Sequence, residues 1–269
     1  MKMNIFLHEI RRHKQSILTW SISLILLLFV FMAMFNSFAS EAEVLNQTLA
    51  QMPKELLTAF GLDGVDMSTV LGFFSFVFLF CQICLAVQAA SYGFGLVSVE
   101  ETDLTADFLL AKPIGRGQIL TSKFLAAFTG LTLTNAVVWI GSFVVIELFR
   151  DSRPYETNTL LLLLISLFFL QLFFLSFAIL LSLLMKRVRS VNTAAMALAF
   201  GMYALSAFGG MLGDETFDLL TPFKHFDPNT IISQQAYELP LVMISVVIIL
   251  LSVAGSYWLY LKRDIHSVN

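Results

Sequence analysis

Six long runs of apolar residues dominate this sequence of 269 residues. An α-helix needs about 20 apolar residues to cross the hydrocarbon core of a bilayer, because lipid offers its backbone no hydrogen-bonding partners. Each run is long enough, and no central proline or charge divides it. The sequence therefore predicts six membrane-spanning helices, at about residues 17–38, 69–97, 119–149, 159–185, 191–212 and 240–261.

The composition excludes a soluble domain of this size. Hydrophobic residues make up 58% of the chain and charged residues only 13%, whereas a soluble domain needs far more polar surface. We therefore expect an all-α membrane protein in which residues 1–269 form a single transmembrane domain. The two cysteines, Cys81 and Cys84, lie in an apolar run without a further His or Cys, so we interpret them as buried small residues.

Lysine and arginine are unevenly shared between the two sides of the predicted membrane. Twelve of the 16 Lys and Arg residues lie in the terminal segments and in the second and fourth connections between spans, with Lys123 counted in the second connection, and four lie in the other connections. Cytoplasmic segments carry the excess of these cations in membrane proteins. We therefore expect a multi-pass protein of the plasma membrane with both termini in the cytoplasm.

The N-terminal arm before the first run has an amphipathic pattern. The apolar positions at helical spacing are Ile5, Phe6, Ile10 and Ile17, and the polar ones mostly opposite them are His8, Arg11, Arg12 and Lys14. This pattern predicts an interfacial helix that lies at the inner membrane surface, with its cations near anionic headgroups, before the chain turns into the first span. A basic topological anchor accounts for the charges equally well.

No catalytic or nucleotide-binding motif stands out in the chain. It has no G-x-x-x-x-G-K-[ST] loop, and its four histidines are scattered over membrane-surface segments. The polar groups inside the runs are mainly uncharged, with amides at Gln82, Gln88, Asn135 and Gln171. Carriers driven by protons or sodium usually use buried Asp, Glu or His instead. We therefore interpret these amides as hydrogen-bonding groups between helices, and expect no enzyme, cofactor or metal site in this chain.

The two longer outer connections are also patterned. The last one, about residues 213–239, mixes aromatic residues with acids and two prolines, which favours short helices that fold back into the interface. The first, about residues 39–68, is expected to carry a short amphipathic helix. Neither is long enough for a large extracellular domain.

The segment EETDLTADFLLAKPIGR, residues 100–116, interrupts the apolar pattern between the second and third runs. Read as a helix, it places Leu104, Phe108 and Ala111 on one face. Pro113 then ends the helix. The sequence predicts a short amphipathic helix and turn at the cytoplasmic surface, since a solvated acidic loop would not explain the apolar spacing.

This segment resembles a pattern found between spans two and three in the membrane subunits of ABC-2-type ABC transporters, E-x-x-x-G-T-x-E-x-L-L-x-x-P-x-S-R. The residues that carry the resemblance are Glu100, Thr105, Asp107, Leu109, Leu110, Pro113 and Arg116. The chain departs from the pattern at Leu104, where the family favours Gly, at Asp107, where Glu is common, and at Gly115, where Ser is common.

The resemblance implies that residues 100–116 form a coupling helix that docks on a separate ATPase subunit. The implied contact residues are Glu100, Thr105, Asp107, Phe108, Leu109, Leu110, Pro113 and Arg116. It also implies two ATPase copies that bind ATP and Mg, a second permease subunit that is identical or paralogous, and a lipid environment. Nucleic acid is not an expected partner.

The expected function is therefore that of a permease subunit in an ATP-driven exporter. An interior rich in Phe and Met suits a hydrophobic or amphipathic substrate, such as an antibiotic, a membrane-active peptide or a lipid-linked molecule. The alternative is a membrane immunity or assembly protein that transports nothing.

Overall fold

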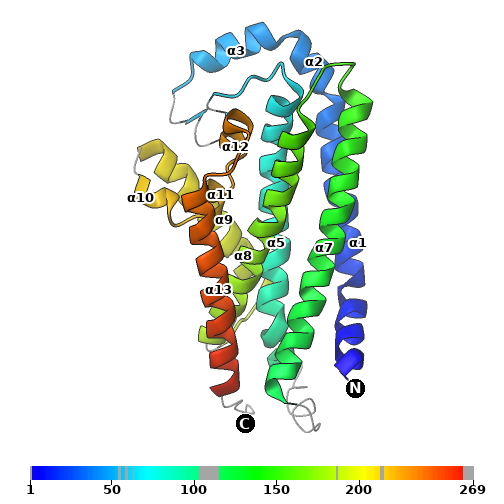
Figure 1. Ribbon diagram of the computed structural model, residues 1–269, viewed down its shortest axis with the longest axis vertical. Coiled ribbons are helices and arrows are strands. Elements are labelled where there is room, and N and C mark those ends of the chain that lie inside the picture. Colours follow the sequence, from blue (N-terminus) through cyan, green and yellow to red (C-terminus); the bar gives the residue numbers. More distant parts are fainter. Residues whose placement is uncertain are drawn as a thin grey trace.

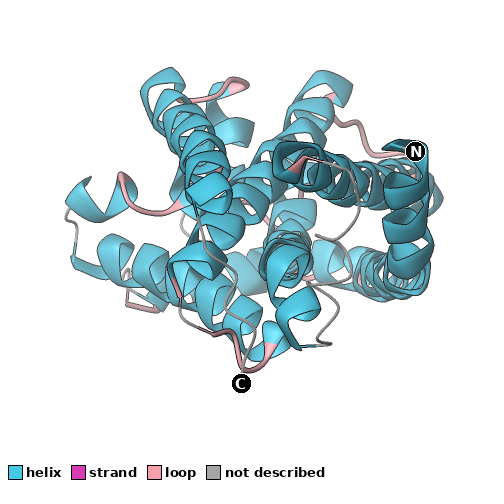
Figure 2. Ribbon diagram, turned by 90° about the horizontal axis from the view of Figure 1, so that it is seen from below, coloured by secondary structure: helices cyan, strands magenta, loops and turns pink. Residues whose placement is uncertain are grey.

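The computed structural model describes residues 2–53, 56–57, 60–62, 64–102, 115–185, 187–212 and 215–262. Six long helices form a bundle with their axes roughly aligned (Figure 1). They are α1 (Lys2–Ala33), α5 (Val70–Thr102), α7 (Arg116–Phe149), α8 (Thr157–Leu184), α9 (Val191–Leu212) and α13 (Leu239–Lys262). Viewed end-on, the described chain consists of helices and their connecting loops, without a strand (Figure 2).

All six long helices are apolar and long enough to cross a membrane. Five of these candidate spans agree with the predicted runs to within three residues at each end. They cover Val70–Ser98, Arg116–Phe149, Thr157–Leu184, Val191–Leu212 and Leu239–Lys262. The predicted class, an all-α membrane protein with six spans, is confirmed.

The first span differs from the prediction, because the N-terminal arm is not a separate interfacial helix. Helix α1 runs without a break from Lys2 to Ala33 and carries the arm directly into the span. The arm contains no Pro or Gly that would end a helix, and α7 packs beside it. The expected turn between an interfacial helix and the first span was therefore wrong.

Helices α1 and α7 run in the same direction and approach closely at two glycines of α7. A Cβ atom on Gly130 would lie 3.3 Å from the Cδ1 atom of Ile17, and one on Gly141 would clash with Ile25. Close approach at these positions fixes the register of α1 along α7. The same register places Glu9 beside Lys123.

Helix α5 lies at the centre of the bundle and contacts α1, α7, α8 and α9. Its span is 83% buried inside the protein, compared with 17% for α13, so α5 forms the core whereas α13 is peripheral. Gly93 permits its contact with α8, because a Cβ atom there would lie 2.6 Å from the backbone oxygen of Leu175. This glycine is therefore required for packing.

Both termini of the described chain lie at one end of the bundle, where α1 begins and α13 ends, and we call this the terminal end (Figure 1). The opposite end carries α2 (Phe35–Ser40), α3 (Ala42–Ala50), α10 (Glu215–Asp218), α11 (Pro222–His225) and α12 (Pro228–Gln234). The short helices predicted for residues 213–239 are thus present.

Polar contacts hold the α11–α12 hairpin against the long helices. Gln82 of α5 donates to the backbone oxygen of Phe226 at 2.8 Å. Thr221 donates to the backbone oxygen of Met202 in α9 at 3.1 Å. The buried His225 shares a 2.6 Å hydrogen bond with Ser245 of α13. The hairpin is therefore fixed to several spans at once.

Candidate functional site

The predicted coupling segment connects α5 to α7 at the terminal end. Helix α5 extends to Thr102, which places Glu100 in its last turn, and Arg116 begins α7. The other predicted contact residues, Thr105, Asp107, Phe108, Leu109, Leu110 and Pro113, lie outside the described residues. The flanking helices therefore show where the segment is attached, and its helical form stays a prediction.

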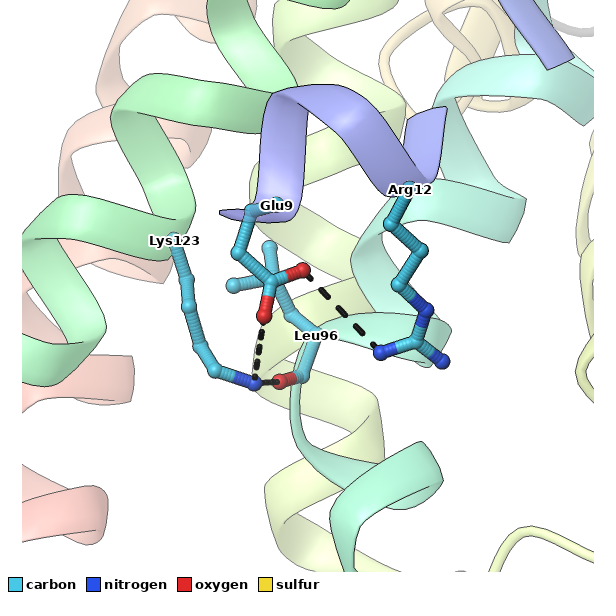
Figure 3. Close-up of polar contacts among 4 residues, drawn as sticks. All are labelled: Glu9, Arg12, Leu96 and Lys123. Carbon is cyan, nitrogen blue, oxygen red and sulfur yellow. Dashed lines mark hydrogen bonds and ion pairs between the residues drawn. The ribbon is translucent and has the colours of Figure 1, made fainter. Parts of the chain in front are cut away.

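Lys123 connects the two helices that flank this segment. It lies about two turns into α7, and its side chain is only 3% exposed. The ammonium nitrogen Nζ donates to the backbone oxygen of Leu96 in α5 at 2.7 Å. The same nitrogen lies 3.7 Å from Oε1 of Glu9 in α1 (Figure 3). One buried cation thus contacts three helices.

Glu9 supplies the opposite charge and is itself buried, with 8% of its surface exposed. It lies between Lys123 and Arg12, whose Nη1 atom is 4.0 Å from Oε2 of Glu9 (Figure 3). Removing a charge from water costs several kcal/mol unless partners compensate it. Glu9 and Lys123 therefore depend on each other, and the pair stabilises this arrangement of α1, α5 and α7.

A second set of contacts joins α1 to α5 one turn further along. The ring of His13 stacks on the ring of Tyr92, with 4.1 Å between centroids and 28° between planes. The Tyr92 hydroxyl also donates to Oγ of Ser16 at 3.2 Å. Together with Lys123, these contacts connect α1 firmly to the end of α5 that leads into the coupling segment.

Sequence reasoning missed the pairing of Glu9 with Lys123. It assigned Lys123 to the connection between spans, whereas the structure places this residue inside α7 with a buried side chain. The sequence marks each residue as unusual by itself but does not indicate that the two form a pair. Lys123 follows the start of an apolar run at residue 119, and Glu9 is the one acid in a basic N-terminal arm.

Deeper in the bundle, three of the predicted amides form one hydrogen-bonded chain. Asn135 of α7 donates to Oε1 of Gln171 in α8 at 2.5 Å. Gln171 donates to Oε1 of Gln88 in α5 at 3.3 Å, and Gln88 donates to Oγ1 of Thr134 at 2.9 Å. The predicted role of these amides in contacts between helices is confirmed. We call these four residues the amide network.

A protein-family model described as "ABC-2 family transporter protein" matches residues 3–265 of the chain. The chain belongs to this family. No curated protein matches its sequence significantly. The resemblance predicted from residues 100–116 is therefore confirmed, and the protein is a multi-pass membrane subunit, or permease, of an ABC transporter. Membership implies association with an ABC ATPase partner.

The described part of this permease contains no group of three or more His, Cys, Asp or Glu residues that could hold a metal ion. Cys81 is buried, Cys84 is partly buried, and both are free thiols. The assembled polar groups, namely the Glu9–Lys123 pair and the amide network, connect helices to one another.

Proposed function

We propose that this ABC-2 permease exports a hydrophobic or amphipathic substrate and is driven by a separate ATPase that docks on residues 100–116. The substrate classes that fit are an antibiotic, a membrane-active peptide or a lipid-linked molecule. In this proposal the terminal end is cytoplasmic, and the protein lies in the plasma membrane. Two ATPase copies bind ATP and Mg, and two permease subunits, identical or paralogous, form the path.

The observation that carries this proposal is the contact of Lys123 with both Leu96 and Glu9. An ATPase that displaces residues 103–114 pushes on the end of α5 and the start of α7. Because Lys123 bonds α7 to α5 and pairs with α1, the three helices respond together. A displacement of the coupling segment therefore moves α1, α5 and α7 together.

The side chains inside the spans support an apolar cargo. The largest fully buried side chains are all hydrophobic, and seven of the twelve are phenylalanines. The described amide network is uncharged and already hydrogen-bonded within the subunit. Such an interior is a poor environment for ions, which favours a hydrophobic or amphipathic cargo.

A charge reversal at Asp107 tests the coupling contact. The permease is expressed with candidate ATPase subunits, and association is measured by co-purification and by ATP hydrolysis in proteoliposomes. We expect Asp107→Lys and Glu100→Lys to weaken association and to reduce hydrolysis. Glu43→Lys makes the same change at an exposed position of α3, at the opposite end, and should leave both measurements unchanged.

The result that overturns the proposal is equally specific. Residues 100–116 are not a coupling contact if the wild-type permease never associates with an ATP-hydrolysing subunit. The same holds if both charge reversals leave co-purification and ATP hydrolysis unchanged. Those results would favour a membrane immunity or assembly protein. The direction of transport is tested separately with inside-out vesicles and fluorescent amphipathic compounds. An exporter should accumulate these compounds inside the vesicles when ATP is supplied.

A further inference from the structure

One face of α1 carries two exposed cations followed by exposed apolar side chains. Arg11 and Lys14 are exposed to solvent. Leu18, Ile22 and Leu26 continue the same face, with exposed fractions of 51%, 66% and 60%. The spacing of three or four residues places all five in one row along the helix. We call this row the α1 lipid face.

The inward position of Glu9 leaves the α1 lipid face positively charged. Glu9 is the one acid in the first 20 residues, and its carboxylate is directed toward Lys123 on the buried side of α1 (Figure 3). Arg12 lies at the edge of the face, with a side chain 40% exposed, and adds a third cation. The surface therefore attracts an anion.

The position of the cations along α1 indicates which anion this is. Leu18 follows Lys14 by one turn, a rise of about 6 Å, and the headgroup layer on each side of a bilayer is roughly 5–8 Å thick. A lipid whose chains cover Leu18 and Ile22 thus places its phosphate beside Lys14 and Arg11. Arginine and lysine both bind phosphate through charge-assisted hydrogen bonds.

We propose that the α1 lipid face binds an anionic phospholipid of the leaflet at the terminal end, which is the cytoplasmic leaflet in the orientation proposed above. The continuous change from cations to apolar side chains fits a headgroup followed by acyl chains. A soluble ATPase surface would match the cations and leave Leu18, Ile22 and Leu26 without a partner. The bound lipid is a feature of the permease alone and is separate from its coupling to the ATPase.

The test uses Trp20 as a fluorescent reporter, because it lies in the same turn of α1 as Leu18 and Ile22, partly buried against the hydrophobic core. The full-length permease carrying Trp139→Phe and Trp258→Phe keeps Trp20 as its one tryptophan. It is reconstituted in vesicles of phosphatidylcholine and phosphatidylglycerol. In one sample the phosphatidylglycerol carries bromine on its acyl chains, and in a parallel sample the phosphatidylcholine does. We expect brominated phosphatidylglycerol to quench Trp20 more strongly, with a preference of roughly fivefold for each cation.

The decisive variant is Arg11→Gln together with Lys14→Gln, which should lower the preference for phosphatidylglycerol by roughly 25-fold and leave about the fivefold preference that Arg12 supplies. The matched control, Arg187→Gln with Arg189→Gln, removes two exposed cations from the connection between α8 and α9 at the same end, and should keep the preference. Native mass spectrometry of chains with all three tryptophans should show the same loss of bound anionic lipid, independently of the reporter variants.

Three results would overturn the proposal. One is equal quenching by both lipids in the reporter protein, together with no retained anionic lipid in the mass spectrum. Another is a preference of the same size in the decisive variant as in the reporter protein. The last is a decisive variant that keeps its lipid preference but no longer co-purifies with the ATPase, which would make this face a protein-docking surface. Since the lipid measurements need no ATPase, they remain valid even if the proposed coupling fails.

Discussion

Lys123 of α7 donates a hydrogen bond to the backbone oxygen of Leu96 in α5 over 2.7 Å. These two residues belong to the helices that flank residues 103–114, so the bond joins the two helices on either side of the predicted coupling segment. Glu9 of α1 lies 3.7 Å from the same ammonium group and extends the connection to a third helix. One buried cation therefore contributes to the free energy that holds the three helices together at this end.

Replacing Lys123 with Met should strongly destabilise the permease. The change removes the bond to Leu96 and takes from the buried Glu9 its nearer cation among the described residues, since Arg12 lies 4.0 Å away. Breaking a buried ion pair by removing one partner typically costs about 3–5 kcal/mol. The measurement is the free energy of unfolding of the purified permease in detergent, followed by circular dichroism.

The double variant Glu9→Gln with Lys123→Met is the diagnostic control for this prediction. It removes the uncompensated carboxylate and should recover part of the stability lost in Lys123→Met. Lys262→Met alters an exposed lysine at the same end and should have little effect. A double variant no more stable than Lys123→Met would show that Glu9 is not the partner that matters.

Hydropathy predicted the spans well because lipid imposes a simple rule on the backbone. A helix must cover the hydrocarbon core with apolar residues, and the run that begins at residue 191 and ends at 212 coincides with α9. The role of the uncharged amides was predictable for the same reason, since a polar group in the hydrocarbon core needs a hydrogen-bonding partner on another helix. Their actual partners depend on packing and were not predictable.

The pairing of Glu9 with Lys123 could not be predicted, because it depends on the register of α1 against α7. That register follows from the contacts of Gly130 with Ile17 and of Gly141 with Ile25, which no periodicity within a single helix reveals. The same packing keeps the N-terminal arm helical beyond the span. The amphipathic pattern therefore did not reveal that the arm also packs against α7.

Gln171 is the central member of the amide network, so Gln171→Leu should destabilise the bundle. The variant removes two hydrogen bonds and leaves Asn135 and Gln88 each with one partner fewer. Hydrogen bonds between membrane helices contribute about 0.6 kcal/mol on average and up to about 1.7, so we expect a loss of roughly 1–3 kcal/mol. Thr132→Val, at an exposed hydroxyl of α7, provides the control. An equal loss in both variants would contradict a special role for the network.

Gly93 should tolerate no side chain, because its α-carbon faces α8 at close range. A Cβ atom would lie 2.6 Å from the backbone oxygen of Leu175 and 2.7 Å from the Cβ atom of Ala178. Overpacking of this kind costs about 1–3 kcal/mol, and we expect Gly93→Ala to lower the melting temperature accordingly. Gly201→Ala is the matched control, since nothing lies within 4 Å of its Cβ position. A stable Gly93→Ala would show that α5 and α8 can separate without cost.

His225 connects the α11–α12 hairpin, at the end of the bundle opposite the termini, to α13. It should make the stability of the permease depend on pH. Its Nδ1 atom lies 2.6 Å from Oγ of Ser245, and 2% of the residue is exposed. Burial lowers the pKa of His225 below its usual value of 6.5, and this effect outweighs the opposing influence of the backbone carbonyls of Leu219 and Asp218. The folded permease therefore favours the neutral imidazole.

Acidification should consequently destabilise the wild-type permease more than His225→Gln. Between pH 6.5 and the lowered pKa of the folded state, the unfolded chain binds more protons at this position than the folded chain does. The contribution of His225 is thus fully present above about pH 6.5 and falls by up to about 1.4 kcal/mol per pH unit below it. Melting temperatures at pH 7.5 and 5.5 measure this difference. His225→Gln should show the smaller decrease, whereas His8→Gln, at an exposed position of α1, should match the wild type. Parallel decreases in all three proteins would show that folding does not change the pKa of His225.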